Sequence, residues 1–250
     1  MTRTNFKELL EAGVHFGHLK KKYNPAMAPY IFMERNGIHI IDLNTTVAMI
    51  EDAAAAMKQI VKSGKKILFV ATKKQAKGII AEAAEALNMP FITERWPGGL
   101  LTNFSTIRKS IKKMETIDKM KTDGTFDTLS KRERLQIERQ RTKLETNLGS
   151  IVKMTRMPHA IFVVDTNKER ISVTEANHLG IKVFAINDTN TNPNLVNFPI
   201  PANDDAAKSI DCIVSILKNA IREGLEEREK DQEAKAFEKK ERAKKISEEK

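Results

Sequence analysis

Residues 160–187 read AIFVVDTNKERISVTEANHLGIKVFAIN and contain the pattern of a strand, a helix and a second strand. The runs 160–165 (AIFVVD) and 182–187 (KVFAIN) are apolar at almost every position, and the segment 170–179 between them has helical spacing. Runs of this kind are typical of parallel strands that are covered on both faces. The stretch therefore predicts a strand–helix–strand unit of an α/β domain.

The same alternation occurs earlier in the chain. A strand is predicted over 66–72 (KILFVAT), a helix over 73–88 and a short strand near Phe91. A long alanine-rich helix over 46–63 precedes them, with Asn44 or Thr45 as its N-cap and Gly64 as its C-terminal stop, and a further helix is predicted over 204–226. The predicted fold class is an α/β domain with a doubly wound parallel sheet.

An insertion separates the strand near Phe91 from the strand at 160–165. Apolar residues recur every three or four positions over 104–120 and again over 137–151, with a polar turn at 122–130 between them. Two helices that fold back on each other would bury these two stripes largely against one another, although Arg141 interrupts the second stripe. Residues 103–157 carry 14 basic and 7 acidic side chains, so this predicted hairpin is strongly basic.

Composition narrows the function classes. Lys and Arg total 43 against 33 Asp and Glu, a net charge of +10, which makes nucleic acid the first polyanion to consider. No apolar run approaches the roughly 20 residues of a membrane span, and no secretory apolar stretch opens the chain, so a cytoplasmic protein is expected. The single cysteine, Cys212, excludes an intramolecular disulfide framework and any multi-cysteine metal site.

The search for catalytic motifs is negative. The chain has no GxxxxGK[ST] or GxGxxG phosphate loop, no GxSxG elbow and no HExxH. His15 and His18, with His39 downstream, have the chemistry of metal ligands, but an isolated histidine pair is more often structural, and no metal or cofactor is expected. Asp165 ends a strand where enzymes place a functional carboxylate, and a turn or helix-cap role is favoured for it.

The residue types at several positions are typical of contact with a polyanion and not of burial in the core. Lys73 and Lys74 begin a helix, where the positive end of the helix dipole disfavours cations unless an external phosphate is bound. Arg95 and Trp96 stand before Pro97 and two glycines, a turn at the carboxyl end of a strand where backbone and RNA can approach closely. The alternative for this turn is that Trp96 is a core residue and the glycines only make the turn.

Residues 15–23 interleave rings with cations, which suits stacking and phosphate contact on irregular RNA. The alternative is that these lysines are simply solvated residues beside a hydrophobic turn, which would produce the same sequence pattern. The complete set of candidate RNA contacts is His15, His18, Lys20, Lys21, Lys22, Arg35, Lys73, Lys74, Arg95, Trp96, Asn103, Arg108, Lys109, Lys112 and Lys113.

Three long stretches resemble the bacterial small-subunit ribosomal protein S-two family. They are GVHFGHLKKKYNPAMAPYIFMERNGIHIIDL at 13–43, RWPGGLLTNFSTI at 95–107, and PHAIFVVDTNKERISVTEANHLGI at 158–181 with FAINDTNTNP at 184–193. Together the similar stretches cover nearly all of residues 1–225. The chain departs from the family pattern at Lys182, where proline is common, and at Tyr23, where tryptophan is usual.

The resemblance implies a non-catalytic protein that binds 16S ribosomal RNA on the solvent side of the small subunit, near the junction of head and body. It implies a coiled-coil hairpin on a flavodoxin-like domain, and neighbouring ribosomal proteins as partners, including the large S-one protein. The expected division is an α/β domain at 1–101 and 158–226, a hairpin at 102–157 and a charged, solvated tail at 227–250.

Two other functions remain as alternatives. One is an enzyme that acts on a phosphorylated small molecule at the carboxyl edge of the sheet, using Asp165, Asp188 and the turn 97–99. The absence of a phosphate-binding motif weakens it. The other is a pure protein-interaction scaffold, which would explain the apolar stripes of the hairpin but not its basic charge.

Overall fold

The computed structural model describes residues 4–248, with side chains described at 4–126 and 128–233. Its larger sheet is parallel, with the strand order β5-β4-β6-β7-β8. The strands are β4 (Ile67–Val70), β5 (Phe91–Ile92), β6 (Ala160–Val164), β7 (Lys182–Asn187) and β8 (Phe198–Pro201). Counted along the chain, this order is 2-1-3-4-5, the flavodoxin-like order of a doubly wound sheet, and the predicted fold class is confirmed.

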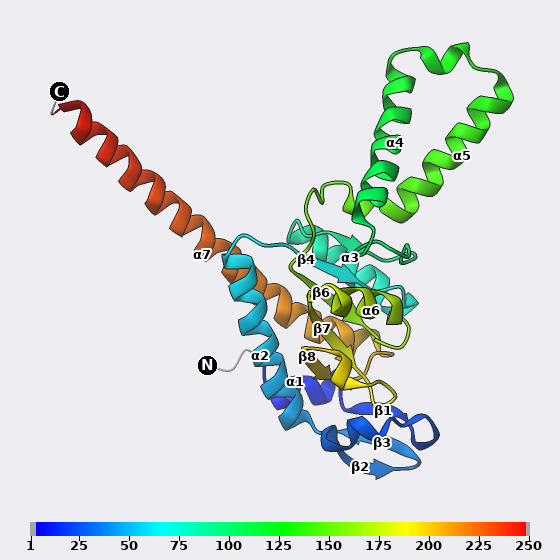
Figure 1. The fold of residues 1–250 in the computed structure, drawn as a ribbon. Coiled ribbons are helices and arrows are strands. Elements are labelled where there is room, and N and C mark those ends of the chain that lie inside the picture. The colour runs from blue at the N-terminus through cyan, green and yellow to red at the C-terminus, as the bar shows by residue number, and fades with distance from the viewer. Residues whose placement is uncertain (1–3, 249–250) are drawn as a thin grey trace.

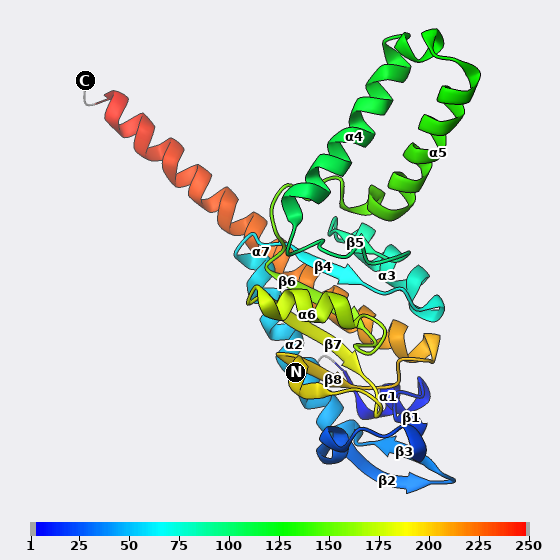
Figure 2. The same ribbon diagram turned by 45° about the vertical axis from the view of Figure 1, so that its right-hand side comes forward.

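Helices cover both faces of this sheet (Figures 1 and 2). One face carries α2 (Leu43–Lys62), α3 (Lys74–Ala86) and α7 (Ala207–Glu248), and the other carries α6 (Arg170–His178). Alternate residues of each strand point to opposite faces, so Phe69 and Phe162 enter the first core while Leu68 and Ile161 enter the second. A buried strand with two apolar faces is what the continuous runs in the sequence require.

The predicted helix boundaries need small corrections. Helix α2 begins at Leu43 because the carboxylate of Asp42 accepts a hydrogen bond from the N–H of Asn44, so Asp42 is the N-cap in place of Asn44 or Thr45. Gly64 follows the helix with φ of 82°, a left-handed conformation that favours glycine, and its predicted role as a stop is confirmed.

Helix α7 is longer than predicted. It continues from the core through the expected tail to Glu248, and its second half projects away from the domain (Figure 1). Gly224 allows α7 to approach α2 closely, since a Cβ there would lie 2.7 Å from the carbonyl oxygen of Lys58. Glu227, one turn later, accepts ion pairs from Lys58 and Lys62. Within residues 4–248, no helix is long and apolar enough to cross a membrane.

The N-terminal region forms a small antiparallel sheet that was not predicted. Strands β1 (Phe16–Leu19), β2 (Ile31–Arg35) and β3 (Ile38–Ile41) pair in the order β1-β3-β2. Asn36 and Gly37, with φ of 53° and 74°, make the tight turn between β2 and β3. Helix α1 (Phe6–Glu11) and the short 3₁₀ turns η1 (Lys20–Lys22) and η2 (Pro25–Tyr30) complete the region.

The basic insertion forms two antiparallel helices, α4 (Phe104–Thr122) and α5 (Lys131–Leu148), as predicted. A 3₁₀ turn, η3 (Thr125–Thr128), lies in the connection, and a capping box between Ser130 and Glu133 starts α5. Arg141 is accommodated on the seam because its Nε donates to the carboxylate of Asp118 on α4 at 2.5 Å. Coiled-coil packing of the pair stays a prediction.

The base of this hairpin packs on the sheet. Ile111 and Leu148 belong to the same buried cluster as Leu68, Val70 and the other strand residues of the second core, as does Ile151 of the following turn η4 (Gly149–Ile151). The expectation that the hairpin buries its stripe largely against itself is therefore wrong for its base. Only the distal part of the hairpin stands clear of the domain (Figure 2).

Candidate nucleic-acid interface

The turn after β5 is built around one carboxylate from α6. Glu175 Oε1 accepts hydrogen bonds from Trp96 Nε1 at 3.1 Å and from the N–H of Gly99 at 2.8 Å. Its Oε2 accepts from the N–H groups of Leu101 and Thr102 at 3.0 and 3.2 Å, and from the Thr102 hydroxyl at 3.3 Å. The buried carboxylate therefore satisfies donors that the backbone hydrogen bonds of the turn, from Leu100 to Pro97 and from Asn103 to Gly99, do not use.

Ionisation of Glu175 suits this role. Burial of the carboxylate acts to raise its pKa, but the hydrogen bonds from Trp96 and from the three backbone N–H groups outweigh burial, and the pKa lies below its usual value. The Trp96 side chain is 7% exposed and packs with the second core, so the structure favours the core interpretation of this residue over an exposed stacking platform. Arg95, next to it, is exposed.

Lys73 and Lys74 have different surroundings. Lys73 Nζ lies 2.8 Å from Asp204 Oδ1, 2.7 Å from Asp205 Oδ1 and 3.6 Å from Asp165 Oδ2, with 12% of its side chain exposed. Burial acts to lower the pKa of Lys73, and these carboxylates raise it further than burial lowers it. Carboxylates of the chain itself therefore already balance the charge of Lys73, and the predicted need for an external phosphate does not arise there, while Lys74 is exposed.

His18 is fixed to the same edge of the sheet. Its Nδ1 lies 2.9 Å from Asp188 Oδ2 and its Nε2 lies 3.4 Å from Asp205 Oδ2, and the bond to Asp188 raises the pKa of the imidazole. His18, Asp188 and Asp204 offer ligand atoms within 4.8 Å of one another. One imidazole and two carboxylates form a donor set that divalent metals accept.

The other two histidines do not join that set. His15 packs on Phe16, with ring centroids 4.0 Å apart, and His39 is buried beside Tyr23, with centroids 4.9 Å apart. The grouping of His15, His18 and His39 considered from the sequence is not assembled. Asp204 was not considered, and its pKa is raised to about 7 by burial and by the neighbouring Asp188 and Asp165.

The remaining candidate RNA contacts fall into exposed and structural groups. Lys21, Lys22 and Arg35 are exposed around the small sheet, and Lys20 is exposed but pairs with Glu34 at 2.7 Å. Four of the candidates are exposed at the start of α4 and along it: Asn103, Lys109, Lys112 and Lys113. Arg108 is half-buried and donates to the carbonyl oxygens of Val152 and Met154, so it braces the base of the hairpin.

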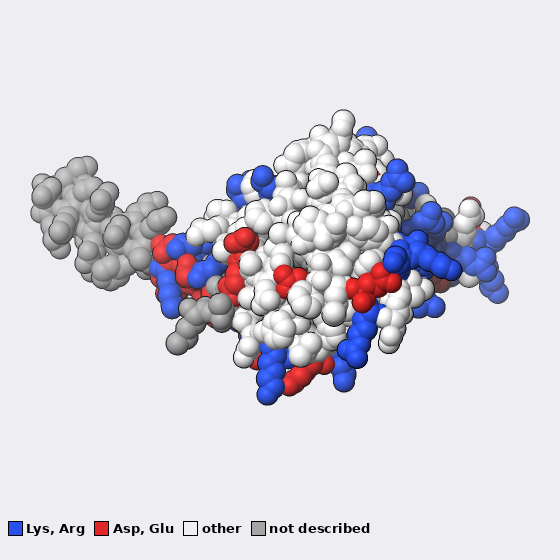
Figure 3. Space-filling model, turned by 90° about the horizontal axis from the view of Figure 1, so that it is seen from below, with Lys and Arg blue, Asp and Glu red and all other residues white. Residues whose placement is uncertain are grey.

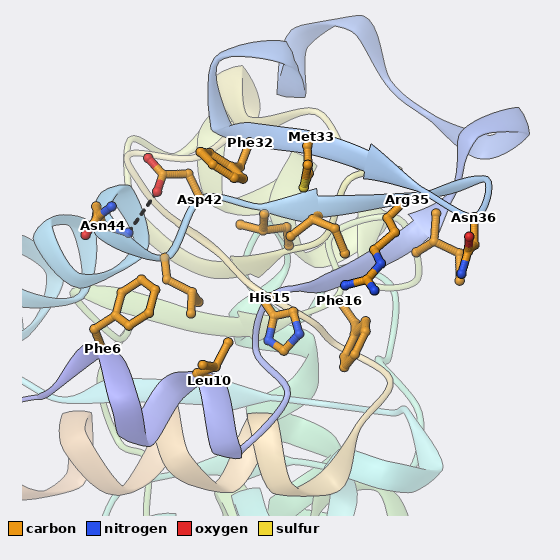
Figure 4. Close-up of a pocket in the computed structure, with 14 residues that line it drawn as sticks. Phe6, Leu10, His15, Phe16, Phe32, Met33, Arg35, Asn36, Asp42 and Asn44 are labelled. Carbon is orange, nitrogen blue, oxygen red and sulfur yellow. Dashed lines mark hydrogen bonds between the residues drawn. The ribbon is translucent and has the colours of Figure 1, made fainter.

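An apolar groove with a volume of about 580 Å³ lies between α1 and the small sheet (Figure 4). Phe6 and Leu10 come from α1, and Phe32 and Met33 come from β2; Phe32 is 70% exposed. Figure 3 shows the end of the molecule nearest this sheet, where uncharged residues fill much of the centre and Lys and Arg gather toward the right-hand side. A partner that binds the apolar groove and an RNA that binds the lysines and arginines would therefore contact different parts of this surface.

Asp165 and Asp188, the carboxylates of the enzyme alternative, have structural partners. Asp165 Oδ1 accepts from the N–H groups of Asn167 and Lys168 at 3.0 and 3.1 Å, which confirms the turn role predicted for it. Asp188 accepts from His18 and from the N–H of Thr189. Neither arrangement pairs a nucleophile with a base.

Comparison with known proteins gives a consistent family. The sequence model of the family described as Ribosomal protein S2 matches residues 9–224. The chain is 68% identical to the small ribosomal subunit protein uS2 of Phocaeicola vulgatus, with 91% of this chain and 82% of that protein aligned. It is 62% identical to the protein of the same name from Parabacteroides distasonis, with 98% and 93% aligned, and 64% identical to that of Azobacteroides pseudotrichonymphae, with 91% and 87% aligned.

Proposed function

This chain belongs to the ribosomal protein S2 family, and from that premise we propose that it is a non-catalytic structural component of the small ribosomal subunit. In this role it binds 16S ribosomal RNA and neighbouring ribosomal proteins and supports translation in the cytoplasm. The flavodoxin-like sheet is then a scaffold, and the side chains that carry function lie on the surfaces around it.

The observation that carries RNA binding is the row of exposed cations on α4. Lys109, Lys112 and Lys113 are exposed, and the segment 103–157 around them holds 14 basic residues against 7 acidic ones. Exposed lysines are sufficient for contact with phosphates, because the affinity comes from charge attraction and from the release of counterions. We assign the hairpin 102–157 as the projecting RNA-binding unit of a domain formed by 1–101 and 158–226.

The triple variant Lys109→Gln, Lys112→Gln, Lys113→Gln tests this role. It should bind 16S ribosomal RNA more weakly at every salt concentration, and its plot of log affinity against log salt should be flatter by about two to three units, since each lost phosphate contact contributes roughly 0.7 to 0.9. Glutamine keeps the helix propensity, so the melting temperature should stay the same. Filter binding over a salt series, beside a melting curve, measures both quantities.

A matched control removes the same charge elsewhere. Lys208, Arg222 and Lys230 are exposed on α7, and their replacement by glutamine lowers the net charge equally. This control should keep nearly the full salt slope. Equal losses from both triple variants would show that net charge alone, and not the hairpin, determines the affinity; unchanged binding by the α4 variant would contradict the proposed RNA surface.

The S-one protein is proposed as one of the protein neighbours, and the apolar groove at the small sheet supports a protein contact of this kind. Among the large hydrophobic side chains that line the groove, Phe32 is the most exposed in the described part of the chain. Phe32→Ser should therefore reduce the S-one protein that stays on purified small subunits after a moderate-salt wash. Full retention of the S-one protein by subunits that carry this variant would contradict the assignment.

A further inference from the structure

A second groove lies at the carboxyl ends of β4, β5 and β6, under the base of the hairpin. Its volume is about 940 Å³, and its walls come from the turns after the three strands and from α4, α5 and α6. In the order β5-β4-β6 this is the point where the strand order reverses, which is where open α/β sheets bind ligands. The groove is separate from the exposed lysines of α4 used above, none of which lines it.

Two sides of the groove are apolar. Ile107 of α4 and Leu144 of α5 are partly buried there, and Ile171 of α6 is 60% exposed. Trp96 forms part of the lining with its largely buried side chain. Apolar walls of this kind suit a flat, unstacked ring that a protein takes out of water.

The rim of the groove is cationic. Arg95, Lys143 and Lys168 line it and are exposed, and Lys168 Nζ donates to the carbonyl oxygen of Thr72 at 3.2 Å. An apolar recess surrounded by cations matches a nucleotide within an RNA strand. The base would lie in the recess, and the phosphates on either side of its sugar would meet the cations.

One buried carboxylate in the groove can distinguish between nucleobases by the hydrogen-bond donors that they carry. Glu169 lines the groove and is 3% exposed, and its Oε1 accepts from both the N–H and the hydroxyl of Thr72, at 2.8 and 2.5 Å. These bonds leave Oε2 for a ligand. Burial raises the pKa of Glu169, which a hydrogen-bond donor from a ligand would offset. A carboxylate oxygen accepts from the exocyclic amino groups of adenine, cytosine and guanine. Uracil has no amino group, and its one ring donor, N3–H, lies between two carbonyl oxygens that repel a carboxylate.

We propose that this groove binds one unstacked RNA nucleotide whose base carries an exocyclic amino group, with Glu169 accepting from that group and Arg95, Lys143 and Lys168 contacting the adjoining phosphates. The proposal rests on the proposed function, since it adds a base-recognising subsite to RNA binding that is otherwise sequence-independent.

The single tryptophan makes a direct test available. Trp96 lines the groove and is the only tryptophan in the 250 residues, so its indole N–H gives one NMR cross-peak that needs no assignment. The full-length protein is titrated with AMP, CMP, GMP, UMP and ribose 5-phosphate to about 10 mM, because a few hydrogen bonds give at best millimolar affinity. The three amino-bearing nucleotides should move the cross-peak with affinities about ten-fold above those of UMP and ribose 5-phosphate.

Glu169→Gln is the decisive variant. The amide oxygen of glutamine still accepts both bonds from Thr72, while its NH₂ group replaces the free oxygen and donates to the groove. The preference should therefore shift away from AMP, whose amino group would face the amide NH₂, and toward UMP, whose carbonyl oxygens O2 and O4 accept. Lys208→Gln, on α7 and outside the groove, should leave all five titrations unchanged.

Three results would overturn the proposal: a cross-peak that no nucleotide moves, ribose 5-phosphate binding as well as the nucleotides, or a base preference that Glu169→Gln does not alter. The salt titration of 16S ribosomal RNA separates the two levels of inference. Steep salt dependence with an unresponsive groove would leave the proposed function standing and remove the nucleotide subsite, whereas failure of both would remove the proposed function as well.

Discussion

Glu175→Ala is expected to lower the free energy of unfolding by about 3 to 5 kcal/mol, because five hydrogen bonds to one buried carboxylate are lost together. The Trp96 indole and the N–H groups of the turn would be left without acceptors. For a chain of this size the melting temperature should fall by roughly 6 to 20 °C. Urea unfolding at neutral pH measures the change.

Glu175→Gln is the matched control. Its amide oxygen replaces one of the two acceptor atoms, but its NH₂ group faces donors. Glu175→Gln should therefore keep less than half of the unfolding free energy that the carboxylate contributes. Because the folded-state pKa of Glu175 is depressed, its contribution should be present above its ordinary pKa of 4.5 and lost as the pH falls through the lower, folded-state pKa. A stability difference between wild type and Glu175→Ala that persists unchanged at lower pH would contradict an ionised carboxylate as the cause.

Lys73→Gln and Lys74→Gln are expected to differ, although the two lysines are adjacent. Lys73 pairs with Asp204, Asp205 and Asp165 at the carboxyl edge, and its removal leaves the buried carboxylates of Asp204 and Asp165 without this cation. Loss of one partner of a buried ion pair costs about 3 kcal/mol or more. Lys74 is exposed, so its replacement should change stability by less than about 0.5 kcal/mol.

The pair of variants also separates RNA contact from folding. Lys74→Gln should flatten the salt slope for 16S ribosomal RNA by about one unit if Lys74 meets a phosphate, with no change in the melting curve. The sequence alone predicts that neither change harms folding, and the carboxylates around Lys73 reverse that prediction for one of the two. Equal melting temperatures for both variants would show that the ion pairs of Lys73 contribute nothing to stability.

The main elements could be predicted because each has a strong local signal. Continuous apolar runs identified β6 and β7, and helical spacing identified α4 and α5. The small sheet was missed although Asn36-Gly37, between two short apolar runs, is a strong hairpin signal. The rings and cations of stretch 13–43 point to RNA contact, and the same stretch also contains the hairpin signal.

The arrangement around the site was not predictable in the same way. Glu175 lies 79 residues from Trp96, and Asp204 lies 131 residues from Lys73, so no local pattern connects them. A glutamate on an amphipathic helix, or an aspartate just before such a helix, usually faces solvent, so neither residue type indicates a buried carboxylate. Only the parallel order of the strands brings their carboxyl ends, and these carboxylates, to one edge.

The close contact of α2 with α7 also bears on the size of the hairpin. Lys58 and Glu223 meet across 165 residues of chain, and the hairpin lies within that loop. The entropy of closing a loop grows only with the logarithm of its length, so omitting 102–157 would ease closure by about 0.4 kcal/mol. The conformational cost of carrying so long an excursion is therefore slight, and the distance that its tip must reach can set its length independently of how the domain folds.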